Sequence, residues 1–325
     1  MNRSSPVVAI VGPTAVGKSD LSIALARRIG AEIINADSMQ LYRGMNIGTA
    51  KLTASERSGV PHHLLDVLDV REPATVAEFQ GWARAAIDEC HTRAVTPILV
   101  GGSALYVRAV LDDFEFPGTD PAIRARYDEE LARIGPEELH GLLAERDADA
   151  ARAILPSNGR RIVRALEVIE LTGRPFAATL PRQEYVYDDV RVLGVDVPRD
   201  VLASRIEQRV DRMWRDGLVE EVRRLEGLGL REGRTASRAL GYAQVLAYLS
   251  GECSEQEARD ATVVRTRQFA RRQDAWFRKD PRIVWHPYDA PDLVDWATRI
   301  ANRDPSLGRA KPGYAEPHDD ALQDG

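Results

Sequence analysis

A phosphate-binding loop is predicted near the start of the chain. The pattern G-x-x-x-x-G-K-[ST] is matched by Gly12, Pro13, Thr14, Ala15, Val16, Gly17, Lys18 and Ser19. The loop lies between a predicted buried strand and a predicted helix, which is the context that this motif requires. Its glycines let backbone N–H groups approach an anion, Lys18 adds a positive charge, and the Ser19 hydroxyl can hold Mg²⁺. We therefore expect a site for a phosphate-bearing ligand.

This loop alone does not identify the phosphates. In many proteins with such a loop, an Asp at the end of another strand helps to hold Mg²⁺. The best buried strand here, at residues 96–102, instead ends in Gly101 and Gly102. Asp66, after a weaker predicted strand, is a candidate substitute. The loop could therefore hold either ATP or a plain diphosphate.

Polar residues follow the three buried strands that are predicted at 6–11, 31–36 and 96–102. Ligands of parallel sheets bind outside the carboxyl ends of the strands, so the residues just after these strands should converge. Asp37 could act there as a general base, and the Ser103 hydroxyl could contact a reacting group. The simpler alternatives are that Asp37 stabilises a turn and that Ser103 caps a helix.

The elements that must position these residues alternate between strand and helix. Helices are predicted at 18–30 and 75–93 and a weaker strand at 62–68, which indicates an α/β fold with a parallel sheet. The strand pattern stops near residue 119, where an Asp cap and a Pro begin a series of helices, and it returns at 190–198 and 282–287.

The expected organisation is a P-loop α/β core with a helical insertion and additional C-terminal helices. We predict a discontinuous core at 1–118 and 190–301, a helical insertion at 119–189, and a disordered tail at 302–325. Long helices would complete the core between residue 199 and about residue 280.

The composition is that of a globular protein. Of 325 residues, 44% are hydrophobic and 29% are charged, and no apolar run is long enough to cross a bilayer. The first strand is predicted to begin near residue 6, so we expect no signal peptide before it. Cys90 and Cys253 lack metal-ligand spacing and fit a reducing compartment. We expect a cytoplasmic monomer without membrane contact.

The net charge of −6 argues mildly against a nucleic-acid partner, so such a partner would need a local patch. Basic residues outnumber acidic ones between residues 259 and 282. Arg267, Arg271 and Arg278 could form a phosphate-binding stripe on one helix face. Phe269 and Trp276 are expected in the core rather than as stacking platforms.

Eight segments together resemble the tRNA dimethylallyltransferases, also called tRNA isopentenyltransferases. They occur in family order between about residues 7 and 287: "GPTAVGKS", "INADSMQLYRGMNIGTAK", "VPHHLLD", "ILVGGSALYVRAV", "NGRRIVRALEV", "IEQRVDRMWRDGLVEEV", "ALGYAQ" and "TRQFARRQDAWFR". Members of this family have a P-loop fold, require Mg²⁺, and transfer a dimethylallyl group from its diphosphate to N6 of the adenine 3′ to the tRNA anticodon. The resemblance implies that the loop holds the donor diphosphate rather than ATP.

The resemblance also implies roles for single residues. Asp37 would take the N6 proton, while Lys18, Arg209 and Mg²⁺ at Ser19 would stabilise the leaving diphosphate. Ser103 would contact the adenine or the leaving group. The anticodon stem-loop, with its target base flipped out, would contact Asp37, Ser38, Met39, Gln40, Ser103, Arg124, Arg160, Arg161 and Arg164. The alternatives are that Arg209 is a solvated helix residue and that the other arginines pair with acids.

Three positions depart from the usual family pattern. Ser103 stands where Thr is commoner, Asn158 where Asp is frequent, and Ala243 where a basic residue is frequent. Three other functions stay open: an enzyme that prenylates free AMP, ADP or ATP, a small-molecule kinase, and a noncatalytic anion-binding module. The predicted helices at 119–189 and the basic segment after residue 259 favour tRNA as the acceptor.

Overall fold

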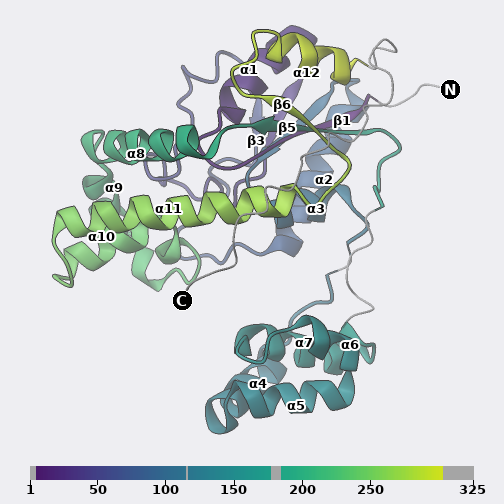
Figure 1. The fold of residues 1–325 in the computed structure, drawn as a ribbon, viewed down its shortest axis with the longest axis vertical. Helices are drawn as coiled ribbons and strands as arrows, with labels where there is room; N and C mark the ends of the chain where they lie inside the picture. The colour runs from purple at the N-terminus through teal and green to yellow at the C-terminus, as the bar shows by residue number, and fades with distance from the viewer. Residues whose placement is uncertain (1–4, 115, 177–183, 303–325) are drawn as a thin grey trace. The chain divides into compact units, whose positions relative to one another are not determined.

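The computed structural model describes residues 5–114, 116–176 and 184–302 (Figure 1). They form two compact units, one from the chain up to Val110 and from Tyr187 onward, and the other from Leu111–Val186. The sequence placed the insertion at 119–189. The tail predicted at 302–325 lies outside the described residues, apart from residue 302.

A six-stranded sheet forms the centre of the first unit. Its order is β3-β2-β4-β1-β5-β6, and every neighbouring pair is parallel. The strands are β1 (Val7–Val11), β2 (Glu32–Asn35), β3 (His62–His63), β4 (Pro97–Gly101), β5 (Val190–Asp196) and β6 (Ile283–Pro287). The prediction of an α/β fold with a parallel sheet is confirmed.

The weak strand predicted at 62–68 is shorter than expected. Only His62 and His63 pair with β2, because Leu64 and Asp66 take positive φ angles of 60° and 58° that end the extended backbone.

Helices cover both faces of the sheet. Figure 1 shows α1 (Lys18–Ile29) and α12 (Leu293–Ala301) on one face and α2 (Val76–Thr92) on the other. Val8 and Ile10 of β1 pack with Leu25 of α1 and Trp296 of α12 in one buried core. Alternate residues of β1 point to the opposite face, and because both faces are covered, all five residues of this strand are buried.

The remaining helices of the first unit follow β4 and β5. They are α3 (Ala104–Leu111), α8 (Arg199–Arg215), α9 (Leu218–Glu226), α10 (Tyr242–Leu249) and α11 (Glu255–Phe277), with 3₁₀ turns η2 (Leu230–Glu232) and η3 (Ala236–Arg238). Ser254 and Glu257 form a capping box that begins α11.

The second unit is helical. It contains α4 (Pro121–Ile134), α5 (Pro136–Arg146), α6 (Ala148–Ala153) and α7 (Gly159–Thr172), which enclose a separate apolar core. The predicted Asp cap is present, since the Asp120 side chain accepts from the N–H groups of Ala122 and Ile123. In the part of the chain that the structure describes, no helix is long and apolar enough to span a bilayer.

Candidate active site

A cavity of about 680 Å³ opens at the carboxyl edge of the sheet. Several predicted site residues line it: Thr14, Ala15, Val16, Gly17, Lys18, Ser19, Asp37, Gln40 and Arg209. Gly12, Pro13, Ser38, Met39 and Ser103 do not line it. Each of the last four is adjacent in sequence to a residue that does, and Gly12 lies two residues before Thr14. The cavity is also lined by most of the segment 46–53 and by residues of α8 and α11.

The shape of the phosphate loop is fixed by its backbone conformation and by Lys18. Gly17 has a φ of 103°, which few other residues adopt. Lys18 Nζ donates to the carbonyls of Gly12 at 3.0 Å and Pro13 at 2.7 Å. Burial, with Arg209 nearby, lowers the pKa of Lys18 to about 7, while the negative charge of Asp37 opposes this shift. Lys18 therefore lies in the electrostatic field of Arg209 and Asp37, which are both predicted to act in the reaction.

Helix α8 presents three arginines to the cavity. Arg205, Arg209 and Arg212 recur at a spacing that places them on one helix face, and all three line the cavity. Arg209 Nη1 donates to Thr14 Oγ1 at 2.8 Å, and Arg205 Nη1 donates to the Val16 carbonyl at 3.2 Å. Sequence reasoning found Arg209 and missed the other two.

Burial lowers the pKa of Arg209, as does the charge of Arg212, whereas Asp37 raises it. The cations gathered at the phosphate loop therefore favour a ligand with several negative charges.

Asp37 has both a structural and an electrostatic place in the site. Its Oδ1 accepts from the Met39 N–H at 2.9 Å, so the turn-stabilising alternative is part of what it does. The buried Asn35 side chain accepts from the Asp37 N–H and donates to the Asp37 carbonyl, which fixes the Asp37 backbone. Burial, followed by the nearby Tyr42 and Asp37, raises the pKa of Tyr106 to about 12, so Tyr106 remains a protonated neighbour of Asp37.

The strand β4 ends without an acid for a steric reason. A Cβ on Gly101 would lie 2.5 Å from the Ala36 carbonyl oxygen, and one on Gly102 would lie 2.4 Å from Gln273 Nε2. Ser103 follows directly, and its carbonyl accepts the Val107 N–H in the first turn of α3. The suggested substitute acid, Asp66, does not line the cavity.

Asp66 instead pairs with a buried lysine. Its Oδ1 lies 2.6 Å from Nζ of Lys51, which also donates to the Tyr42 carbonyl. This pairing uses Asp66 to neutralise a buried charge.

A buried carboxylate organises the cavity wall at 46–48. Glu221 of α9 is 6% exposed and accepts from the N–H groups of Asn46, Ile47 and Gly48. It also accepts from the Tyr242 hydroxyl at 2.6 Å. Three backbone N–H groups therefore fix this segment to one carboxylate, which the Tyr242 hydroxyl holds from another element.

The predicted tRNA-contacting arginines of the second unit fall into two groups. Arg124 and Arg164 both pair with Glu167, whose side chain is fully buried, at 2.9 and 2.8 Å. Burial opposes ionisation of Glu167, yet hydrogen bonds from Thr119 and Arg164 hold its pKa below the ordinary value. Arg160 and Arg161 are exposed in the first turn of α7. The first pair thus stabilises the unit, while the second pair is accessible.

The proposed arginine stripe on α11 is similarly divided. Arg267 pairs with Glu207, and Arg278 pairs with Asp196 and Asp274, whereas Arg271 is exposed. The expectation that Phe269 and Trp276 lie in the core is wrong: Phe269 lines the cavity and Trp276 is 52% exposed. The seven-residue spacing could not show which face of α11 is covered.

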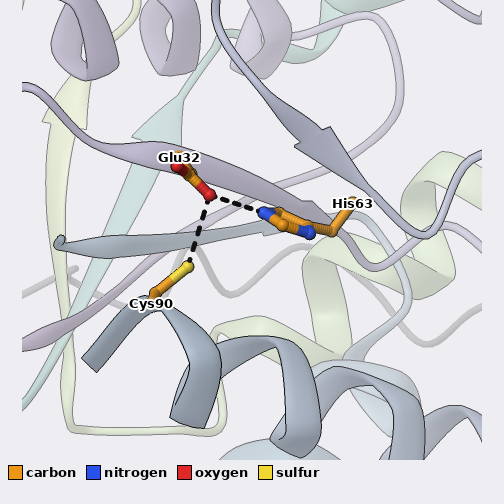
Figure 2. A group of neighbouring side chains, drawn as sticks. All are labelled: Glu32, His63 and Cys90. Carbon is orange, nitrogen blue, oxygen red and sulfur yellow. Dashed lines mark hydrogen bonds and ion pairs between the residues drawn. The ribbon is translucent and has the colours of Figure 1, made fainter. Parts of the chain in front are cut away.

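A separate cluster at the start of β2 has the composition of a metal site. Figure 2 shows His63 and Cys90 directed at Glu32, with His63 Nε2 2.7 Å from Glu32 Oε2. However, Arg93 donates to both carboxylate oxygens, at 2.5 and 2.7 Å. Burial, followed by the Glu32 charge, raises the pKa of Cys90 to about 11, which disfavours the thiolate that a metal needs. The cluster is a structural ion pair and does not fit a cation.

The fold and the cavity together define a class of protein. A strand, a phosphate loop and a helix lie at the carboxyl edge of a parallel sheet, and the loop faces a carboxylate and several cations. This is a P-loop α/β protein in which no acid follows the central strand β4.

Comparison with known proteins narrows this class to one family. Residues 40–280 match the IPP transferase family. A tRNA dimethylallyltransferase of Thermobifida fusca is 64% identical over 298 residues, covering 90% of this chain and 93% of that protein. One of Streptomyces coelicolor is 66% identical over 279 residues, covering 86% and 89%. The chain belongs to the IPP transferase family of tRNA dimethylallyltransferases.

Solved structures agree with this assignment. The tRNA isopentenylpyrophosphate transferase of Bacillus halodurans is 40% identical, with a TM-score of 0.68 over 92% of this chain and 95% of that one. A eukaryotic dimethylallyltransferase described as acting on tRNA is 28% identical, with a TM-score of 0.79 over 94% of this chain and 78% of that one. The family resemblance read from the sequence is confirmed.

Proposed function

We propose that this protein transfers a dimethylallyl group from dimethylallyl diphosphate to N6 of the adenine 3′ to the anticodon of tRNA. The observation that carries the proposal is the placement of Asp37, which lines the same cavity as the phosphate loop and lies in the electrostatic field of Lys18 and Arg209. Two of the relatives reported above are named tRNA dimethylallyltransferase, which supports the transfer to tRNA. The enzyme would work as a cytoplasmic monomer.

The geometry supports two separate roles, proton removal by a base and stabilisation of the leaving diphosphate by the anion site. The adenine amine is a weak nucleophile because its lone pair is delocalised, so a base that removes the N6 proton while the C–N bond forms would help. Asp37 would be that base. The C–O bond to the diphosphate breaks as the C–N bond forms, and the growing negative charge would be stabilised by the loop N–H groups, Lys18 and Arg209.

Magnesium fits the donor set at the loop. Ser19 and Asp20 both line the cavity, and their side chains carry a hydroxyl and a carboxylate, the kind of oxygen ligand that Mg²⁺ prefers. Ser19 would hold the ion against the donor diphosphate, where it would neutralise part of the charge.

The tRNA contacts would come from both units. Ser38, Met39 and Gln40 follow Asp37, and Ser103 follows the cavity residue Gly102, so these four would contact a flipped-out adenine and its neighbours. In the second unit, the exposed Arg160 and Arg161 would contact RNA phosphates. Arg124 and Arg164 would also contact the tRNA while they remain paired with Glu167.

The test uses purified protein, Mg²⁺ and dimethylallyl diphosphate labelled in its hydrocarbon part, without ATP. Unmodified tRNA and free AMP are offered in separate reactions. We expect label in tRNA alone. Label in AMP alone would move the assignment to the adenylate prenyltransferases, and label in neither would return the loop to ATP and the kinase alternative.

A further inference from the structure

Gln273 is a buried polar side chain for which the proposed reaction gives no role. It lies on α11, is 8% exposed and lines the cavity. Its Nε2 donates to the Gly102 carbonyl at 2.7 Å, and its Oε1 accepts from the Thr14 N–H at 2.9 Å. One amide therefore joins the loop that carries Lys18 to the loop that carries Ser103.

The surroundings of Gln273 require a side chain that both donates and accepts, as an amide does. Thr14 offers an N–H, which needs an acceptor, and Gly102 offers a carbonyl, which needs a donor. An ionised carboxylate would supply only acceptors, and an apolar side chain would leave both backbone groups unpaired. Gly102 makes the approach possible, because a Cβ there would lie 2.4 Å from Gln273 Nε2.

The hydrogen bonds of Gln273 connect it to Arg209, the arginine that is predicted to stabilise the leaving diphosphate. Thr14, which donates its N–H to Gln273, also accepts from Arg209 through its hydroxyl at 2.8 Å. A continuous chain of hydrogen bonds thus runs from Gly102 through Gln273 and Thr14 to Arg209. It connects the end of β4, the phosphate loop and α8.

We propose that Gln273 is a positioning residue that sets the spacing between the phosphate loop and the β4–α3 loop. It occupies the space beside the loop at the end of β4, where no acid is present. The inference rests on the proposed function, because those two loops would hold the donor diphosphate and the adenine acceptor.

Two substitutions test this role in the full-length enzyme. Gln273→Leu removes both bonds, and we expect kcat/KM for the donor to fall about 10- to 100-fold, since small misplacements of reacting groups cost that much. Gln273→Glu keeps an acceptor for the Thr14 N–H but sets a negative oxygen against the Gly102 carbonyl. Protonation at lower pH would restore the donor, so its activity relative to wild type should rise as the pH falls.

The matched control is Gln268→Glu, an exposed position on the same helix, which should keep the wild-type pH profile. Thermal unfolding checks that each variant is folded. If Gln273→Leu is unfolded, the pH profile of Gln273→Glu alone tests the proposal. A Leu variant that is folded and within about twofold of wild type, or a Glu variant whose relative activity ignores pH, would overturn the proposal.

Binding of inorganic diphosphate, measured by calorimetry, separates this claim from the proposed function. Weaker diphosphate binding by Gln273→Leu supports the positioning role of Gln273, even if the wild-type enzyme labels no tRNA. Unchanged diphosphate affinity in a folded Leu variant contradicts it, even if wild-type enzyme does label tRNA.

Discussion

Arg209 Nη1 donates a hydrogen bond of 2.8 Å to Thr14 Oγ1. This bond links helix α8, which carries Arg209, to the phosphate loop, which carries Thr14. Burial lowers the pKa of Arg209, the charge of Asp37 opposes this shift, and the charge of Arg212 adds to it. A diphosphate bound beside Thr14 would favour the charged form of Arg209.

This relationship predicts a donor-specific defect in Arg209→Gln. Loss of the cation should lower kcat/KM for dimethylallyl diphosphate by about 100- to 1000-fold, as for other groups that stabilise developing charge. The KM for tRNA should stay near the wild-type value in steady-state assays. Arg215→Gln, at the exposed end of α8, is the matched control. An equal loss in the control would show that the effect is general.

Lys18 predicts a pH dependence of donor binding. Its pKa is about 7 in the folded chain against 10.5 in the unfolded one, so the unfolded chain binds the extra proton between these values and stability rises with pH there. A diphosphate favours the charged ammonium, so binding should take up a proton at a pH of about 8 and weaken as the pH rises. Calorimetry in buffers of different ionisation enthalpy measures this uptake. If Lys18→Met shows the same uptake as wild type, the proton belongs to another group.

Much of the core could be predicted from local patterns. The phosphate loop, the parallel strands and the caps at Gly30 and Asp120 carry their signals within a few residues. Asp37 could be placed because parallel strands bring their carboxyl ends to one edge.

Other features depend on contacts between distant segments. Gln273 forms hydrogen bonds with Gly102 and Thr14, which lie 171 and 259 positions before it in the sequence. Glu221 likewise accepts from backbone N–H groups of the distant segment 46–48. The sequence around each of these residues gives no sign of such a contact. The exposure of Trp276 likewise depends on which elements cover α11. The pairing of Asp66 with Lys51 could not be seen because both lie in irregular chain.

Asp37→Asn separates the catalytic role of this residue from its role in the turn. Asn can still accept from the Met39 N–H, so the turn should persist, whereas the base is lost. We expect kcat to fall about 100- to 10,000-fold, the range for general bases, with tRNA affinity kept within about twofold. Single-turnover transfer and tRNA binding are measured on the same preparation. Normal turnover in Asp37→Asn or Asp37→Ala would exclude Asp37 as the base.

The ion pair between Glu32 and Arg93 predicts a loss of stability in acid; Figure 2 shows Glu32 with its other two neighbours, His63 and Cys90. Hydrogen bonds from Arg93 and then His63, opposed by burial, lower the pKa of Glu32 to about 2 from an ordinary 4.5. Its contribution is fully present above pH 4.5 and is lost as the pH falls toward 2. Glu32→Gln should therefore cost about 1–3 kcal/mol of unfolding free energy at neutral pH, and the difference should shrink in acid.

Urea unfolding across this pH range measures the effect, with the exposed Glu89→Gln on α2 as the control. A chelator should leave the stability unchanged, because Arg93 rather than a metal neutralises Glu32. A pH-independent difference between Glu32→Gln and wild type would contradict the ion-pair account.

The most direct test of what the phosphate loop holds is a competition measurement on the wild-type protein. Labelled dimethylallyl diphosphate is bound in the presence of Mg²⁺, and unlabelled ATP or inorganic diphosphate is then added over a wide concentration range. We predict that inorganic diphosphate displaces the donor readily, that ATP does so poorly, and that Lys18→Met binds the donor weakly. Efficient displacement by ATP, with donor binding unaffected by Lys18→Met, would contradict the assignment of the loop to the prenyl donor.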